Sequence, residues 1–247
     1  MEYSLIEEGL HELRTMLCLN DNEFRTLLLI NEKTKGNSGT GAWNTGIQWA
    51  YKNYPEGYVS ILDDDDEYLL NHLQDCNGKL NVNNSIVAVF QQIQWKNTDG
   101  SIINTSINRN DLSPEGFFIG NPGVQGSNMF FKTKILIDID GFDEKLPNTT
   151  DRDIMIRFFW YLDKNPSLNF EVIEDAGVIH HNHGDYKVNN DIGLKHIGLN
   201  IFYAKFARYF SIAAQEKSLI RADMFFGYKQ EKPAADEVIV IGMPLKK

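Results

Sequence analysis

The stretch YVSILDDDDEYLL, residues 58–70, joins a short apolar run to four consecutive aspartates. The run YVSIL is typical of a strand that is covered on both faces. Four neighbouring carboxylates repel one another, so a fold that holds them at a strand end needs something to neutralise them. One explanation is a solvated acidic turn that caps a helix starting near Glu67, and the other is a bound divalent cation.

The preceding segment completes the pattern of a parallel βαβ unit. Residues 26–30 (TLLLI) predict a strand, residues 31–41 a polar, glycine-rich loop, and residues 42–54 a helix. A strand at residues 58–62 then gives the order strand, loop, helix, strand. Ligands of open parallel sheets bind beyond the carboxyl ends of the strands, which is where Asp63–Asp66 begin. This position favours Mg²⁺ or Mn²⁺, which bind one or two carboxylates together with phosphate groups.

The rest of the chain alternates between predicted helices and strands. Helices are expected at residues 4–18, 67–76, 151–164 and 191–216, a hairpin joins strands at 85–95 and 101–107, and a strand at 168–175 precedes a loop at 175–191. These elements predict an α/β fold with a mixed, mainly parallel sheet flanked by helices. We expect a catalytic domain at residues 1–190 and a helical extension at residues 191–247 that packs on it.

Composition excludes several functional classes. The 247 residues are 42% hydrophobic and carry a formal net charge of −10, which argues against a general nucleic-acid binder. No stretch approaches the roughly 20 apolar residues of a membrane span, and the acidic start does not resemble a secretory signal. Cys18 and Cys76 have no CxxC spacing, so we expect free thiols in a reducing compartment and a cytoplasmic protein.

Three stretches together resemble the family 2 glycosyltransferases with the GT-A fold. Residues 37–50 (NSGTGAWNTGIQWA) are similar to the family's N-x-G-x-x-x-A-R-N-x-G helix start, and residues 58–69 match its DXD strand end. Residues 126–162 are similar to the block that contains a G-G-F-D-E turn and an E-D-x-D-x-x-x-R helix. The resemblance covers residues 25–185, with order and spacing in agreement.

The resemblance implies a Rossmann-like GT-A domain that moves a sugar from a nucleotide-diphosphate donor to an acceptor hydroxyl, with inversion. Asp63 and Asp65 match the DXD pair and would bind Mn²⁺ or Mg²⁺, with Asp64 or Asp66 in support. Neutralising charge that develops on the leaving diphosphate is a task for a metal ion. The acceptor itself remains open.

Asp151 matches the position of the family's catalytic base, which removes the proton of the acceptor hydroxyl. The alternative role for Asp151 is a helix N-cap, for which Thr149 and Thr150 compete. Asp153 and Arg157 are four residues apart on the same helix, where they can form an ion pair.

Further residues are expected at the donor. Asn44 matches the asparagine of the family's first helix, and Gly126, Ser127 and Asn128 would lie near the donor sugar. Departures from the family fall on the same side, since the usual first strand is missing and Trp43 replaces an arginine. The donor's identity is therefore not predicted.

Three histidines, His180, His181 and His183, follow the predicted strand at residues 168–175. In the family, a histidine from a late loop completes the metal site or contacts the diphosphate. His181 and His183 are the candidates here, and a polar loop with hydrogen-bonded histidines is the alternative.

Other functions and contacts stay open. One is a non-catalytic GT-A-like module that binds nucleotide-sugar or glycan, and another is a two-metal hydrolase or nucleotidyltransferase, without HExxH or P-loop spacing to support it. Residues 199–215 could contact a membrane surface or a second copy in a homo-oligomer, but packing on the domain is expected. Phe117, Phe118 and Trp160 are expected in the core rather than on an acceptor platform.

Overall fold

The computed structural model describes residues 39–182 and 191–230. The chain divides into two compact units, Met1–Glu32 and Lys33–Lys247, and every described residue lies in the second. The predicted first helix and first strand, both within the first unit, therefore lie outside the described residues. No helix in the described part of the chain combines the length and apolar character that a bilayer crossing requires.

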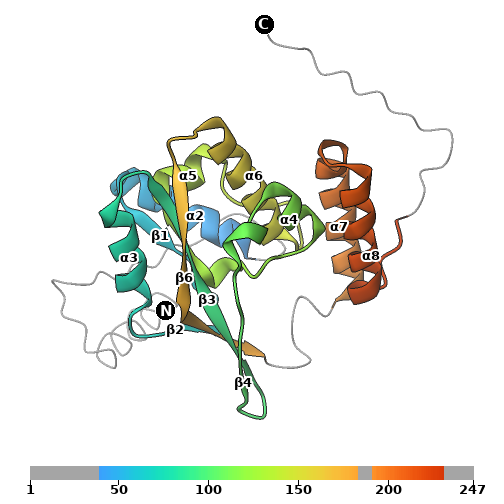
Figure 1. The fold of residues 1–247 in the computed structure, drawn as a ribbon, viewed down its shortest axis with the longest axis horizontal. Coiled ribbons are helices and arrows are strands. Elements are labelled where there is room, and N and C mark those ends of the chain that lie inside the picture. The colour runs from blue at the N-terminus through green and yellow to red at the C-terminus, as the bar shows by residue number, and fades with distance from the viewer. Residues whose placement is uncertain (1–38, 183–190, 231–247) are drawn as a thin grey trace, which may run out of the picture. The chain divides into compact units, whose positions relative to one another are not determined.

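The described elements follow one another in a mixed α/β order (Figure 1). They are α2 (Thr40–Asn53), β1 (Tyr58–Ser60), β2 (Asp66–Tyr68), α3 (His72–Val82), β3 (Ile86–Asn97), β4 (Ile102–Asn104), η1 (Arg109–Asp111), α4 (Pro114–Ile119), η2 (Gly126–Asn128), β5 (Met129–Lys132), α5 (Thr133–Asp138), α6 (Thr150–Lys164), β6 (Asn169–Asn182), α7 (Ile192–Phe206), η4 (Ala207–Tyr209) and α8 (Ile212–Phe226). The predicted helices at 42–54 and 151–164 are confirmed as α2 and α6.

The strands form one mixed sheet in the order β1-β5-β3-β6-β2, with β4 paired to β3. Among the described pairs only β3 and β6 run parallel, so the expectation of a mainly parallel sheet is wrong for this part of the chain. The error has a physical cause, because a central antiparallel strand that is covered on both faces is as continuously apolar as a parallel one. Helix α2 and strand β1 match the last two elements of the predicted parallel βαβ unit, whose first strand lies outside the described residues.

Strand β6 is longer than predicted. Residues 175–182 were expected in a loop, yet β6 continues to Asn182 and pairs with β3 as far as Asn97. A register shift moves the pairing from Gln91 opposite Ile173 to Gln92 opposite Ala176, so two polar residues of β6 are accommodated in a bulge. Because polar residues usually mark the end of a buried strand, the residues of this bulge led to the prediction of a loop.

The segment after the aspartates is also a strand rather than a helix. Asp66–Tyr68 form β2, which pairs antiparallel with the end of β6, and helix α3 begins only at His72. A helix starting near Glu67 is therefore excluded, and with it the cap explanation of the acidic run. The register places Asp66 directly opposite His180.

The predicted hairpin is confirmed as β3 and β4. Asn97 donates its backbone N–H to the carbonyl of Ser101 at 2.9 Å, and Gly100 turns the chain with φ 83°. The positive φ is one that glycine adopts without steric cost.

The larger core cluster combines aliphatic side chains with many phenylalanine rings. Phe90 of β3 meets Phe131 of β5 and Phe158 of α6, with ring centroids 5.7 and 6.0 Å apart. On the opposite face Cys76 and Leu80 of α3 pack over the sheet in a second, smaller cluster. Figure 1 shows α3 on the left of the sheet and α4 and α6 on the right.

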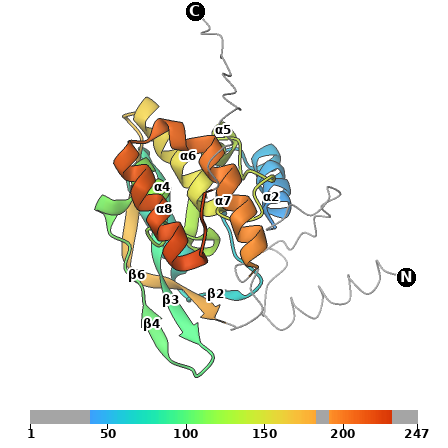
Figure 2. The same cartoon turned by 90° about the vertical axis from the view of Figure 1, so that its right-hand side faces the viewer.

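The helical pair α7 and α8 lies beside α4 and α6 (Figure 2). Phe118 of α4 is fully buried and stacks on Phe202 and Phe210, with centroids 5.9 and 4.2 Å apart. Half-buried Trp160 of α6 meets Phe206 at 5.6 Å. The predicted core position of Phe118 is confirmed, and the described C-terminal helices contact α4 and α6 through these rings.

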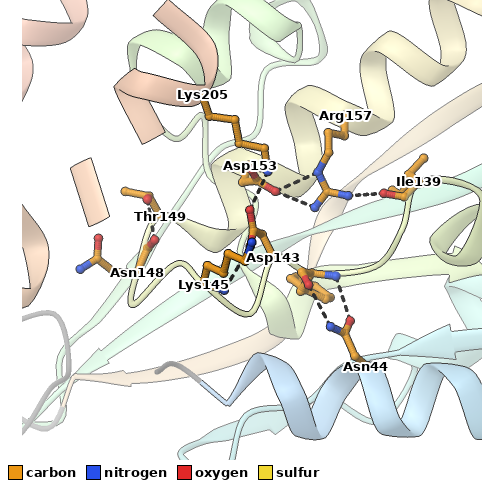
Figure 3. A network of polar contacts seen from close by, with 10 residues as sticks. Asn44, Ile139, Asp143, Lys145, Asn148, Thr149, Asp153, Arg157 and Lys205 are labelled. Atoms are coloured by element: carbon orange, nitrogen blue, oxygen red, sulfur yellow. Dashed lines mark hydrogen bonds and ion pairs between the residues drawn. The ribbon is translucent and has the colours of Figure 1, made fainter. Parts of the chain in front are cut away.

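A buried polar network joins α6, α7 and the turn after α5 (Figure 3). The Asp153 side chain is 0% exposed and accepts hydrogen bonds from Arg157 Nε at 2.8 Å and Nη2 at 2.6 Å, which confirms the predicted pair. Lys205 of α7 bonds both Asp153 and Asp143. Arg157 also donates to the carbonyl of Ile139.

We expect Asp153→Ala to lower the free energy of unfolding by about 3–5 kcal/mol, because the largely buried Arg157 loses its carboxylate partner and Lys205 keeps only Asp143. Urea unfolding of the full chain measures this change. Asp163→Ala is the matched control, since Asp163 is an exposed acid of the same helix. A loss below about 1 kcal/mol for Asp153→Ala would show that the network contributes little.

Candidate active site

Three acidic side chains converge where β1 ends and β2 begins. One carboxylate oxygen from each of Asp63, Asp65 and Asp66 lies within 4.8 Å of the other two. Asp63 and Asp65 are the residues that the sequence predicted, whereas Asp66 had been given only a supporting role. Asp64 is exposed and is not part of the group.

The cluster is electrostatically unfavourable on its own. The pKa of Asp63 is raised to about 6, mainly by burial and then by the negative charges of Asp66, Asp65 and Asp64 in that order, against the opposing charge of His180. A divalent cation would offset this repulsion, and a set of carboxylate oxygens is the type of ligand that Mg²⁺ and Mn²⁺ prefer. The residues present therefore fit such an ion.

Residues 126–128 form hydrogen bonds and packing contacts next to the acidic cluster. Ser127 is fully buried, and its Oγ accepts a hydrogen bond from the backbone N–H of Asp63 at 3.0 Å. The Asn128 amide donates to the carbonyls of Gln91 and Gly123 at 2.9 and 3.0 Å. Of these polar groups, predicted beside a sugar, Ser127 holds the backbone after β1, and Asn128 holds this segment against β3 and the Gly123 loop.

Gly126 is a point of close approach. A Cβ at this position would lie 3.0 Å from the Trp43 ring, so the indole that replaces the family's arginine packs directly on the glycine backbone. The third predicted residue of this segment therefore also has a packing role.

Asn44 is engaged in a similar way. Its amide accepts from the N–H of Phe142 and donates to the carbonyl of the same residue, both at 2.8 Å, and also donates to Glu144 at 2.9 Å. Figure 3 shows Asn44 reaching from α2 to this turn. The side chain that was predicted at the donor holds the Gly141–Phe142 turn, where Gly141 has φ 57°.

The histidines of β6 point to different partners. His180 places Nδ1 at 2.6 Å from Oδ1 of Asp66, while His181 places Nε2 at 2.8 Å from Glu67. His183 lies outside the described residues. Successive strand residues face opposite sides of a sheet, so only one of the two neighbours can reach the cluster. The structure places His180 beside the acidic cluster. The sequence did not show this because it depends on the pairing of β2 with β6.

Asp151 is the second residue of α6, and Thr149, with φ 61°, is the N-cap. The alternative role of Asp151 as N-cap is thereby excluded. Its carboxylate forms no hydrogen bond with a described residue, and it lines a cavity of about 340 Å³ together with His180. The pKa of Asp151 is raised to about 7, first by burial and then by the charge of Asp63, against the opposing charges of Lys195 and His180. This is the environment of a proton acceptor that works near neutral pH.

The same cavity is lined by residues that the sequence did not single out, among them Trp95, Lys195, Arg221 and Phe226. Burial lowers the pKa of Lys195 to about 8, with the charge of Arg152 as the next cause. Lys195 and Arg221 come from α7 and α8, which had been assigned to packing alone. Their proximity to Asp151 depends on long-range packing that has no local sequence signal.

A larger cavity of about 780 Å³ lies between α2 and the turn after α5. It is bordered by Asp143, Arg157 and Lys205, whose charges are already paired in the network of Figure 3. Its size alone does not make it the reaction site, because the unpartnered carboxylate of Asp151 faces the smaller cavity.

The raised pKa of Asp151 predicts a pH-dependent cost to stability. The folded state keeps the proton to about pH 7 while the unfolded state loses it near 3.8, so the carboxyl destabilises the fold increasingly as the pH rises between these values. The free energy of unfolding of Asp151→Asn relative to wild type should therefore be larger at pH 8 than at pH 5, by about 1–3 kcal/mol. Urea unfolding at both pH values measures the gain, with Asp163→Asn as control. An equal difference at both pH values would contradict the cause assigned to the pKa shift.

Comparison with known proteins gives a weak structural likeness. No protein-family model and no curated protein sequence matches the chain. A crystal structure of S. aureus TarS superposes with a TM-score of 0.43 and 15% identity, covering 76% of this chain and 36% of that one. A crystal structure of S. aureus TarS 1-349 gives 0.44 and 14%, covering 76% and 59%. The chain thus spans about a third to three fifths of these structures, and TM-scores of this size assign no function.

Proposed function

We propose that this protein is a metal-dependent glycosyltransferase that moves a sugar from a nucleotide-diphosphate donor to an acceptor hydroxyl with inversion. One observation carries the proposal. His180 contacts Asp66 of the acidic cluster at 2.6 Å and lines the same cavity as Asp151, so the cluster and this carboxylate are joined through one side chain. A cation site and a free base beside one cavity are the two devices that such a transfer needs.

The first device concerns the leaving group. Asp63, Asp65 and Asp66 would hold the cation, and His180 positions Asp66 through the 2.6 Å contact. A bound Mg²⁺ or Mn²⁺ supplies Lewis acidity that neutralises charge developing on a diphosphate. Ser127 keeps the Asp63 backbone in place while the substrates exchange.

The second device is the base. Asp151 accepts the proton of the acceptor hydroxyl, so that the oxygen attacks the anomeric carbon from the side opposite the diphosphate. The bond to the diphosphate breaks as the new glycosidic bond forms, and the configuration is inverted. A carboxylate whose pKa is about 7 is a stronger base than an ordinary aspartate, which suits this step.

Two measurements test this function. Calorimetric titration with UDP, GDP and TDP, each with and without Mn²⁺, should show that at least one nucleotide binds only in the presence of the ion. The corresponding nucleotide-sugars should release their diphosphate slowly to water. Binding without any release would favour a non-catalytic module, and the absence of metal-dependent binding for all three nucleotides would refute the proposal.

A further inference from the structure

Two cationic side chains from the C-terminal helical pair line the cavity of Asp151. Lys195 Nζ lies 4.6 Å from the ring centroid of Phe226, and Arg221 Cζ lies 4.6 Å from that of Phe225. Neither cation makes a hydrogen bond or ion pair with another described residue. One carboxylate, that of Asp151, faces these two cations in the cavity, and a half-buried charge that is not fully neutralised is costly. The cavity therefore has room for a further negative charge, which a ligand would supply.

Cationic side chains outnumber acidic ones around this cavity. Lys195 is the fourth residue of α7, close to the positive end of the helix dipole, where a cation is unfavourable. Asp151 is the only acid among the lining residues. The lowered pKa of Lys195, about 8, agrees with this account, because burial and the charge of Arg152 both disfavour its ammonium form.

The third cation of the cavity, Arg152, is already engaged. Its guanidinium donates to the carbonyls of Phe117 and Phe118 at the end of α4, and it lies 3.4 Å from Ser218 Oγ. Lys195 and Arg221 are therefore the groups that remain for a ligand.

We propose that the acceptor carries an oxyanion, a phosphate or a carboxylate, which Lys195 and Arg221 hold while its hydroxyl lies against Asp151. The inference rests on the proposed function, which makes this cavity the acceptor site. The diphosphate of a donor already has its own counter-charge in a cation at Asp63 and Asp65. A second site for negative charge beside the base thus serves the other substrate.

Three small probes test the proposal, namely glycerol 3-phosphate, glycerate and glycerol. They share a carbon skeleton with hydroxyl groups and differ in the phosphate, the carboxylate or the absence of charge. Calorimetric or NMR titration of the full chain should show binding of at least one anionic probe and none of glycerol at the same concentration. Which anion binds more tightly distinguishes a phosphate acceptor from a carboxylate acceptor.

Variants identify the binding groups. Lys195→Met should weaken the anionic probe about tenfold or more, as expected for a lost hydrogen bond to a charged group. Lys217→Met is the matched control, because Lys217 is exposed on α8, and it should bind as the wild type does. If both variants bind equally well, the proposal is wrong.

Gly120→Ala displaces Arg221 without removing its charge. A Cβ at Gly120 would lie 2.5 Å from Nε of Arg221, so the guanidinium has to move. We expect weaker binding of the anionic probe, comparable in size to the effect of Arg221→Gln. Circular dichroism and urea unfolding of the variants check that the fold is retained, and unchanged binding in well-folded Gly120→Ala and Arg221→Gln would exclude Arg221.

The outcomes separate this inference from the function on which it rests. Metal-dependent nucleotide binding and sugar release, together with no preference for anionic probes over glycerol, would overturn the acceptor class alone. If an anion binds in a Lys195-dependent way and no nucleotide binds, the anion site is supported and the proposed transferase function is refuted. If Lys195→Met weakened nucleotide-diphosphate and probe equally, the cation would belong to the donor, and the inference would be wrong.

Discussion

Asp151→Asn is expected to lower the rate of sugar transfer by about 10²–10⁴-fold, the range that a positioned general base contributes. The amide has nearly the same shape as the carboxylate but cannot accept the proton of the acceptor hydroxyl. Metal-dependent binding of the nucleotide should stay within about twofold of the wild type, because Asp151 is outside the acidic cluster. The measurement pairs transfer kinetics with calorimetry on the same protein preparations.

The pH profile gives an independent readout of the base. Since Asp151 has to be ionised, transfer should rise with pH up to about 7 in the wild type. A cation bound at Asp63 would remove the repulsion from that carboxylate and move the rise to lower pH. The residual activity of Asp151→Asn should lack this acid limb. Transfer at the wild-type rate by the variant would show that another group is the base.

The second large effect is expected at the acidic cluster. Asp65→Asn should weaken Mn²⁺-dependent nucleotide binding by at least about 100-fold, because losing even an outer-shell partner of a metal typically costs about 10–100-fold. One negative charge fewer also reduces the attraction of the remaining oxygens for a hard cation. Calorimetry with the best nucleotide at fixed Mn²⁺ concentration measures the loss.

Asp64→Asn is the matched control for this experiment. Asp64 belongs to the same acidic run, but its side chain is exposed and is outside the convergent group. The affinity of the Asp64→Asn variant for the nucleotide should fall by no more than a few fold, because only the net charge near the site changes. Equal losses for Asp64→Asn and Asp65→Asn would indicate a general effect of negative charge in place of direct ligation.

Local patterns in the sequence predicted much of this structure because they depend on local physics. The helical periodicity of residues 151–164 and the Asn97–Gly100 turn are short-range signals, and both elements are confirmed. The Asp153–Arg157 pair followed from helical spacing alone. The position of Asp63 and Asp65 after a buried strand was likewise sufficient to bring them together.

Other parts depended on contacts between distant segments. The role of His180 became visible only when β2 paired with β6, since that register puts Asp66 opposite it. The polar residues of the bulge in β6 were interpreted as the end of the strand, because the sequence does not show that β6 continues to pair with β3 beyond them. Lys195 and Arg221 reach the cavity through the packing of α7 and α8.

Asn44 and Ser127 illustrate a further limit of sequence reasoning. Both are polar residues beside predicted motifs, and such residues serve a ligand or the backbone equally well. The structure shows hydrogen bonds from Asn44 to the Phe142 backbone and from the Asp63 backbone to Ser127. Residue type alone does not distinguish these roles, whereas partner atoms do.

The most direct test is a crystal structure of the protein grown with Mn²⁺ and a nucleotide diphosphate, with anomalous scattering used to locate the metal. We predict one anomalous peak at roughly 2.0–2.6 Å from carboxylate oxygens of Asp63, Asp65 or Asp66, with the diphosphate bound to the same ion. A nucleotide bound elsewhere, or a cluster whose carboxylates stay free of metal at saturating Mn²⁺, would contradict the account.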